Sequence, residues 1–121
     1  AALRINDQDI SARNNLANVL LRQGKIDEAI QHYEFVLSLN PRYAKGYNNL
    51  GAAYMMGSDL KRASQAFAKT LKLDPQNAEV HFHLARLYNS QGLQSRAATE
   101  MKLYEQKNQA ASKKKAQAQN E

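Results

Sequence analysis

The sequence predicts an all-α protein made of repeated pairs of antiparallel helices. Apolar and small residues recur without gaps at an offset of about 34 residues, which places Leu16, Leu50 and Leu84 in one column. Glycine or proline separates the apolar stretches at regular places. At about 100° per residue, the first stretch of each repeat also divides into two faces of different character, as expected of an amphipathic helix. Together these observations indicate three helix pairs.

Small and large side chains occupy separate columns of the repeat. The small columns allow the two helices of a pair to approach closely, so enlarging Ala63 to leucine is expected to overpack the contact and cost about 1–3 kcal/mol. Large residues such as Tyr33 and Phe67 fill the space above and below. The small columns are Ala17, Gly51 and Ala85 in the first helices and Ala29, Ala63 and Ala97 in the second helices.

The expected helices begin and end at recognisable signals. Gly24 and Gly92 suit the left-handed conformation that follows a helix, and the middle repeat offers Gly57 and Ser58 at that place. Prolines such as Pro41 stop the second helices, because the residue before proline is pushed out of the α region. Helices are therefore expected at 10–23, 27–39, 44–56, 60–73, 78–90 and from about 95 onward.

The first nine residues resemble the end of a repeat. Leu3 and Ile5 fall one period before Leu37 and Leu39. Residues 1–9 are therefore expected to be the end of a preceding repeat, and the alternative is an N-terminal cap.

The third repeat lacks a closing proline. Residues 95–121 contain neither glycine nor proline, so the last helix is expected to continue past Gln109, with its apolar contacts fading after Tyr104. The expected divisions of the chain are 10–43, 44–77 and 78–111 for the three repeats, followed by a polar, lysine-rich tail at 112–121 that is expected to be frayed.

These columns and helix pairs resemble the tetratricopeptide repeat, from Ile10 to about Ala111. The resemblance implies a right-handed α-solenoid, which is a superhelix of antiparallel helix pairs. It also implies a function, because in such arrays the first helices of the repeats line a concave groove where peptides bind. The chain is therefore expected to be an interaction module, acting as a scaffold or adaptor, with a protein or peptide partner in the groove and no cofactor.

The residues expected in this groove lie on the first helix of each repeat, opposite the side that carries Ala17 and Leu20. Asparagine is frequent there although it is a mediocre helix former, and its carboxamide offers both a donor and an acceptor to an extended backbone. Methionine and phenylalanine side chains add adaptable apolar contacts. The expected groove residues are Asn14, Asn15, Asn18, Arg22, Lys45, Asn48, Asn49, Met55, Met56, Phe82, His83, Arg86 and Asn89.

One column of this face is similar to the asparagine ladder in the repeat domain of O-linked N-acetylglucosamine transferases. There the ladder holds the backbone of substrate proteins, which implies the same role for Asn15 and Asn49. His83 occupies the third rung, so the third repeat departs from the ladder. The alternative interpretation is that these asparagines are only solvated or lie against the next repeat.

A second family pattern does not fit. Chaperone-binding tetratricopeptide domains clamp a C-terminal carboxylate with two asparagines and three cations. The matching positions here are Asn14, Asn18, Asn49, Glu79 and His83, so both asparagines are present, all three cations are missing and Glu79 has the opposite charge. We therefore expect no binding of a heat-shock-protein tail.

Composition and spacing give no indication of an enzyme. The chain has no cysteine, no phosphate-cradling glycine loop and no recognisable pair of nucleophile and base. His81 and His83 are two residues apart, which places them on different helix faces and prevents joint metal binding. We expect neither a metal nor a cofactor, and a soluble protein for which the cytoplasm is favoured over the periplasm.

The net charge of +6 is concentrated at the C-terminus, because residues 106–121 carry four lysines against one glutamate. Lys113, Lys114 and Lys115 lack aromatic neighbours that could stack on bases, so neither a nucleic acid nor a membrane is expected as a partner.

Two other functions remain open from the sequence. The chain could be the substrate-recruiting part of a larger enzyme such as a glycosyltransferase. It could also be a self-associating scaffold that forms a homo-oligomer through its open repeat ends, where Leu3, Ile5 and Ile10 would meet a partner chain.

Overall fold

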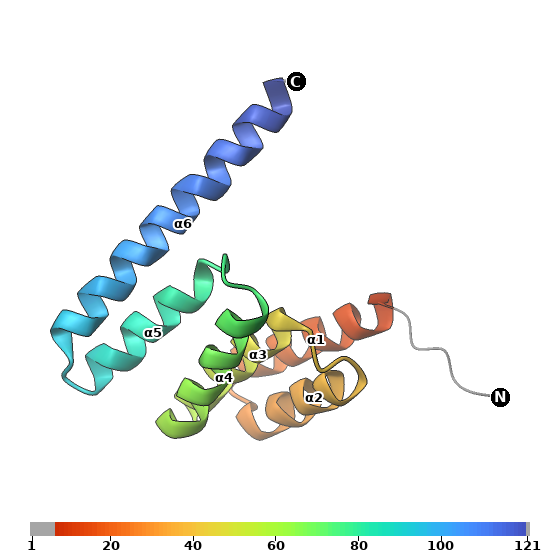
Figure 1. The fold of residues 1–121 in the computed structure, drawn as a ribbon. Coiled ribbons are helices and arrows are strands. Elements are labelled where there is room, and N and C mark those ends of the chain that lie inside the picture. Colours follow the sequence, from red (N-terminus) through yellow and green to blue (C-terminus); the bar gives the residue numbers. More distant parts are fainter. Residues whose placement is uncertain (1–6, 121) are drawn as a thin grey trace. The chain divides into compact units, whose positions relative to one another are not determined.

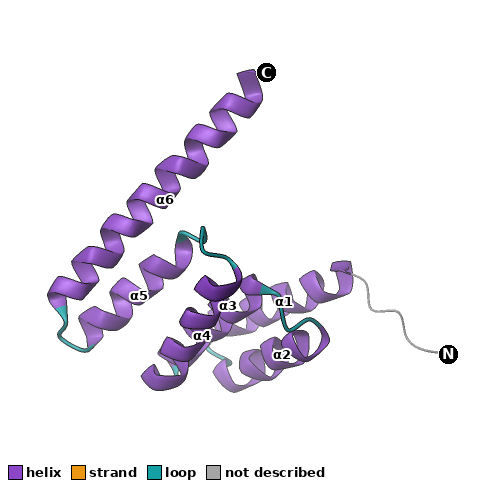
Figure 2. Cartoon of the chain, in the orientation of Figure 1, coloured by secondary structure: helices purple, strands orange, loops and turns teal. Residues whose placement is uncertain are grey.

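A computed structural model of the chain describes residues 7–120. The chain divides into two compact units, Ala1–Leu73 (unit 1) and Asp74–Glu121 (unit 2). Within the described residues every regular element is a helix, six in all, which confirms the all-α prediction (Figure 2). None of these helices combines the length and the hydropathy that a membrane span requires.

Unit 1 contains the first two predicted helix pairs (Figure 1). Helix α1 packs on α2, helix α3 packs on α4, and α3 also packs on α2. The predicted helix bounds agree with the structure to within one residue, except at the start of α1. The helices are α1 (Asp7–Arg22), α2 (Ile26–Leu39), α3 (Ala44–Met56) and α4 (Leu60–Leu73).

Helix α1 begins three residues before its predicted start at Ile10. Residues 7–10 contain neither proline nor glycine, so the backbone there can adopt helical geometry without a break. Acidic residues in the first turn, including Asp9, also interact favourably with the positive end of the helix dipole. The helix therefore starts before the predicted repeat boundary at residue 9, and that boundary stays a prediction. The part of the prediction that concerns residues 1–6 lies outside the described residues.

The turns between paired helices share one hydrogen-bond pattern. The amide of Lys25 donates to the carbonyl of Leu20, five residues earlier, at 2.9 Å, and the equivalent bonds recur in the other two repeats. The residue before this donor is left-handed in each case: Gly24 at φ +82°, Gly92 at φ +77° and, in the middle repeat, Ser58 at φ +64°. The glycines behave as predicted. In the middle repeat the serine, and not Gly57, takes the left-handed position.

The small-residue columns allow close packing in unit 1. Ala17, Ala29 and Ala63 are completely buried, and Tyr33 belongs to the same core cluster as Ala17 and Ala29. A Cβ atom added at Gly51 would lie 2.5 Å from the ring of Phe67. Glycine is therefore required at position 51, where the ring of Phe67 lies directly against the backbone of α3, whereas the other two repeats have alanine there.

Unit 2 consists of α5 (Glu79–Ser90) packed against α6 (Gln94–Asn120). Helix α6 runs back along α5 and extends well beyond the first residues of α5 (Figure 1). Residues 112–120 of the predicted tail belong to α6, which continues to Asn120, and the expected fraying stays a prediction. Alanine, lysine and glutamine are all good helix formers, and no glycine or proline interrupts them. Side-chain burial nevertheless fades as predicted, since Lys107 is the last half-buried residue of α6 in the described range.

Candidate functional site

The face of α1 and α3 that was expected to line the groove is partly closed. Asn14 is 4% exposed and Asn48 is 2% exposed. Nδ2 of Asn49 donates to Oδ1 of Asn14 at 3.4 Å, which links α3 to α1. Oδ1 of Asn48 is buried without a hydrogen-bond partner among the described residues. Both asparagines were expected to face a peptide, but their burial removes them from the accessible surface.

Asn18 is engaged inside its own repeat. The hydroxyl of Tyr33 on α2 donates a short hydrogen bond to Oδ1 of Asn18. Burial raises the pKa of Tyr33 to about 12, against a smaller opposing effect of the Arg22 charge. Tyr33 is therefore a neutral donor at ordinary pH, and Asn18 acts mainly as its acceptor rather than as a free groove residue.

The accessible part of the predicted face in unit 1 is smaller than the sequence suggested. Asn15 is exposed, whereas its ladder partner Asn49 is half-buried. Met56 presents 52% of its surface to solvent, so an apolar side chain does accompany the carboxamides. The other accessible residues are Arg22 and Lys45, which are exposed, and Met55, which is half-buried.

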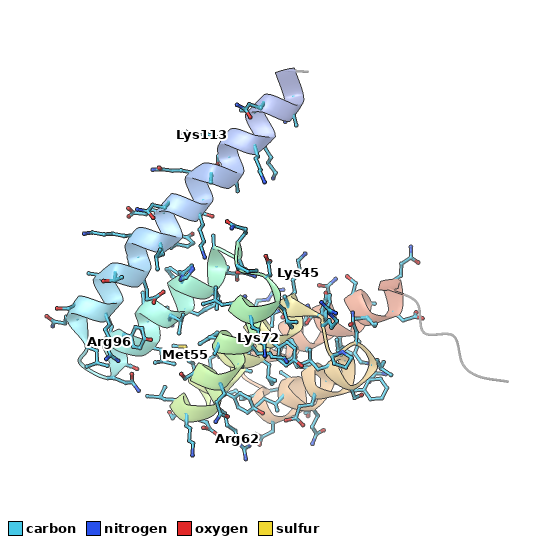
Figure 3. All side chains as sticks on the ribbon, viewed as in Figure 1. Lys45, Met55, Arg62, Lys72, Arg96 and Lys113 are labelled. Carbon is cyan, nitrogen blue, oxygen red and sulfur yellow. The ribbon has the colours of Figure 1, made fainter. Side chains whose placement is uncertain are left out.

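A hollow of about 490 Å³ lies beside this face. Lys45, which was predicted as a groove residue, contributes to its wall, and Figure 3 labels this side chain near the start of α3. The backbone amide of Arg42 donates to Oδ1 of Asn40 at 3.2 Å, which shapes the loop along one side. The lining residues are Ile10, Ser11, Asn40, Arg42, Tyr43, Ala44 and Lys45.

Of these lining residues, the sequence predicted only Lys45 for the groove. Three of the residues that it missed are Asn40, Arg42 and Tyr43. They lie in the loop between α2 and α3, so a helical wheel cannot include them. The turn sequence around Pro41 could have indicated them, because turns that follow a proline-terminated helix bring their side chains next to the start of the following helix.

In unit 2, two of the predicted residues have side-chain neighbours, Phe82 and His83, and the other two are exposed. The Phe82 ring is 37% exposed and lies 5.5 Å from the ring of Tyr104, measured between centroids. Nε2 of His83 lies 3.5 Å from Oε1 of Glu79, one helical turn earlier. Arg86 and Asn89 are exposed. The negative charge of Glu79 therefore accompanies His83, at positions where the chaperone-type clamp has cations.

The fold and the repeat columns agree with three family models. A tetratricopeptide-repeat model matches residues 44–77, a second matches residues 1–31, and a TPR repeat model matches residues 17–57. The chain is a tetratricopeptide-repeat protein. The match over 44–77 coincides with the predicted second repeat.

The chain is also similar to curated proteins, of which three follow. The chloroplastic tetratricopeptide repeat domain-containing protein PYG7 of Arabidopsis thaliana is 37% identical over 73 residues, which is 60% of this chain and 24% of that protein. Hsp70-Hsp90 organizing protein 3 of Arabidopsis thaliana is 30% identical over 64% of this chain and 14% of that protein. Mouse protein O-mannosyl-transferase TMTC3 is 30% identical over 72% of this chain and 10% of that protein. The chain spans about a quarter or less of the length of each.

A solved tetratricopeptide structure has the same fold. The type III secretion chaperone SycD of Yersinia enterocolitica, in complex with a peptide of the translocator YopD, superposes with a TM-score of 0.76. The identity is 17%, and the match covers 87% of this chain and 80% of SycD. At this identity the likeness concerns the fold alone.

Proposed function

We propose that this tetratricopeptide-repeat chain is a protein-interaction module that holds an extended segment of a partner protein along α1 and α3. The observation that carries the proposal is the position of Asn15 and Asn49 one repeat apart, with Asn15 exposed and Asn49 half-buried. A carboxamide can accept from a backbone N–H and donate to a backbone C=O, so it can hold a peptide without reading its side chains. The family and the peptide-bound state of SycD support this assignment.

The hollow beside Lys45 supplies a place for a side chain of that segment. Its wall carries two cations, Arg42 and Lys45, together with the hydroxyl of Ser11 and the apolar side chain of Ile10. A segment with an acidic residue near an apolar one complements this lining. Within unit 2, Arg86 and Asn89, both exposed, and the partly exposed Phe82 remain proposed peptide contacts of that unit alone.

The test is a pull-down from lysate with the original chain and with Asn15→Ala. Asn15 is the cleaner variant, because Asn49 also donates to the buried Asn14 and its removal disturbs packing. Asn108→Ala on the exposed surface of α6 is the matched control. Proteins captured by the original and by the control, but not by Asn15→Ala, would support the proposal. Equal capture by all three would contradict it. Circular dichroism checks that each variant folds.

No chemical step is proposed for this chain. The second proposal follows instead from the TMTC3 match: the chain is a recruiting segment of a longer transferase, with the chemistry in another domain. The full-length gene decides between the two, because a gene without a transferase domain excludes the second.

Self-association is a third candidate, supported by an apolar surface in repeat 1. Leu16 is 47% exposed and Val19 is 43% exposed, whereas Leu50 and Ala53 at the same positions of repeat 2 are 7% and 0% exposed. Phe35 on α2, 44% exposed under the guanidinium of Arg13, extends this surface.

This surface differs from the open end that the sequence suggested. Leu16 is exposed, and Ile10, which was expected at the open repeat end, is only 7% exposed. Leu3 and Ile5 lie outside the described residues. Light scattering over a concentration series tests self-association, with Leu16→Gln as the variant that should shift the chain toward monomer. A monomer at every concentration would contradict it.

A further inference from the structure

Helix α4 has a strongly basic outer surface. Its sequence contains four lysine or arginine residues and no acidic residue. At about 100° per residue, these four cations and one glutamine fall within about 100° of arc. We call this surface the α4 basic face, and it consists of Lys61, Arg62, Gln65, Lys69 and Lys72. Figure 3 labels Arg62 and Lys72, which lie toward opposite ends of α4.

The α4 basic face borders an apolar hollow of about 300 Å³ between α3 and α4. Leu50, Tyr47 and Tyr54 of α3 and Ala66 of α4 give it an apolar lining, and Arg62, Gln65 and Lys69 complete its wall. The hollow is at the lower end of the volumes that ligand pockets have. Cations and an apolar cavity are therefore side by side within unit 1.

The cations are held over the aromatic walls of this hollow. The Lys69 ammonium lies 5.9 Å from the centroid of the Tyr47 ring, and the Arg62 guanidinium lies 5.9 Å from that of Tyr54. These distances are within the range of a cation–π attraction, which orients the charged groups without neutralising them. A ligand that enters the hollow would meet two positioned cations at its edge.

Two acidic residues are close, and both have structural partners. Glu34 of α2 accepts a hydrogen bond from the Tyr54 hydroxyl at 3.0 Å. Asp59 accepts from the backbone amide of Arg62 at 3.1 Å and pairs with its side chain at 3.6 Å. The α4 basic face therefore retains a positive excess, because four cations face two carboxylates.

We propose that the α4 basic face and its hollow form a second docking surface, separate from the α1–α3 face, for an acidic protein segment that presents an apolar side chain between carboxylates. The apolar side chain occupies the hollow, and the carboxylates pair with Arg62 and Lys69. The positive charge of the face favours an acidic partner, and an apolar hollow bordered by Arg62 and Lys69 suits an apolar side chain between two carboxylates.

Nucleic acid and membrane fit this surface less well. Cations already lie over one face of the Tyr47 ring and one face of the Tyr54 ring, which reduces the aromatic surface on which bases could stack. The exposed face of α4 presents Gln65 and Ala68 at its centre rather than large apolar residues that could enter a bilayer.

The test measures fluorescence anisotropy of a labelled synthetic peptide in which glutamate alternates with leucine and phenylalanine, blocked at both ends. Arg62→Glu/Lys69→Glu should weaken its binding about tenfold or more, because each reversed charge replaces an attraction with a repulsion. Lys25→Glu, an exposed charge reversal elsewhere in unit 1, should leave binding within about twofold. Arg62→Gln/Lys69→Gln is the milder variant if the double reversal fails to fold, and it should weaken binding in the same direction.

Three outcomes would overturn the proposal. The first is an equal loss in Lys25→Glu, which would mean diffuse attraction by net charge. The second is loss of binding in Asn15→Ala, which would place the peptide on the α1–α3 face instead. The third is equally tight binding of a single-stranded oligonucleotide or of anionic vesicles that the double reversal also removes. Because Asn15→Ala should leave this binding unchanged, failure here and failure of the proposed function are distinguishable.

Discussion

Nζ of Lys107 on α6 lies 2.7 Å from Nε2 of His81 on α5. His81 is 3% exposed, and its Nδ1 lies 2.6 Å from Oε2 of Glu100. A lysine ammonium has donors only, so Nε2 must accept, and the ring proton must then sit on Nδ1 and be donated to Glu100. Lys107 also donates to the carbonyl of Pro75. The interaction fixes one tautomer of a buried histidine and ties α6 to the start of unit 2.

Lys107→Ala should lower the free energy of unfolding by about 1–2 kcal/mol, because it removes two charge-assisted donors from partners in a largely buried cluster. Lys113→Ala on the exposed part of α6 is the matched control and should change it by less than about 0.5 kcal/mol. Urea unfolding measures both. The imidazole ¹⁵N shifts of His81 should report the Nδ1–H tautomer, and an Nε2–H tautomer would contradict the assigned donors.

Tyr33 should make the chain sensitive to alkali. Its pKa is raised from 10.0 to about 12 in the folded state, so the unfolded state ionises first as the pH rises. The stability contributed by the neutral phenol is complete below pH 10.0 and is lost as the pH rises toward about 12. Tyr54, whose pKa is raised by burial and by its hydrogen bond to Glu34, acts in the same direction.

Tyr33→Phe should therefore flatten, without abolishing, the loss of stability in alkali. At neutral pH it should cost about 0.5–1.5 kcal/mol, because the hydrogen bond to Asn18 is lost. Urea unfolding at stepped pH measures both effects. An unchanged slope above pH 10.0 would show that Tyr33 does not remain neutral there.

Asn14 and Asn48 occupy the same repeat position but differ in hydrogen bonding. Asn14→Ala should destabilise by about 1 kcal/mol, since it removes the acceptor of Asn49. Asn48→Ala should be close to neutral or stabilising, because it removes a buried oxygen without a partner among the described residues. The comparison cancels the helix propensity gained in each variant. Equal losses in thermal unfolding would contradict the assigned hydrogen bonds.

Ser58 is left-handed at φ +64°, a conformation that costs a residue with a Cβ about 1–2 kcal/mol. Ser58→Gly should therefore raise stability, by about 0.5–1 kcal/mol after the greater flexibility of glycine in the unfolded chain is subtracted. Ser64→Gly, an exposed site inside α4, is the opposite control and should lower stability by about 0.5 kcal/mol. A loss in both variants would mean that Ser58 makes a contact that offsets its strain.

Most of the fold could be predicted from the repeat period and from the glycines and prolines that separate the helices. The bounds of α3 and α4 agree with the prediction, because the turn residues and prolines on each side act locally on the backbone. The start of α1 and the end of α6 could not be predicted as well, since the local signals there are weak. Helix continuation then depends on summed propensity rather than on one stop residue.

The candidate site was less predictable than the fold. A helical wheel places Asn14, Asn15 and Asn18 on one side of α1, yet one is buried against α3, one is exposed and one accepts from Tyr33. The wheel shows which face of one helix a residue lies on, but the neighbouring helix buries part of that face. Which asparagine remains accessible is therefore a property of helix packing.

The sequence by itself determined the helix pairs, the family and the need for small residues such as Gly51, because these depend on spacing along one chain. Only the tertiary structure decided which polar groups are buried or hydrogen-bonded to other side chains of the protein. It buries Asn14, joins His81 to Glu100 and Lys107, and leaves a hollow beside Arg62 and Lys69. The physical reason is that burial and hydrogen bonding depend on side chains from other helices. The separation of two residues in the sequence does not indicate whether their side chains are in contact.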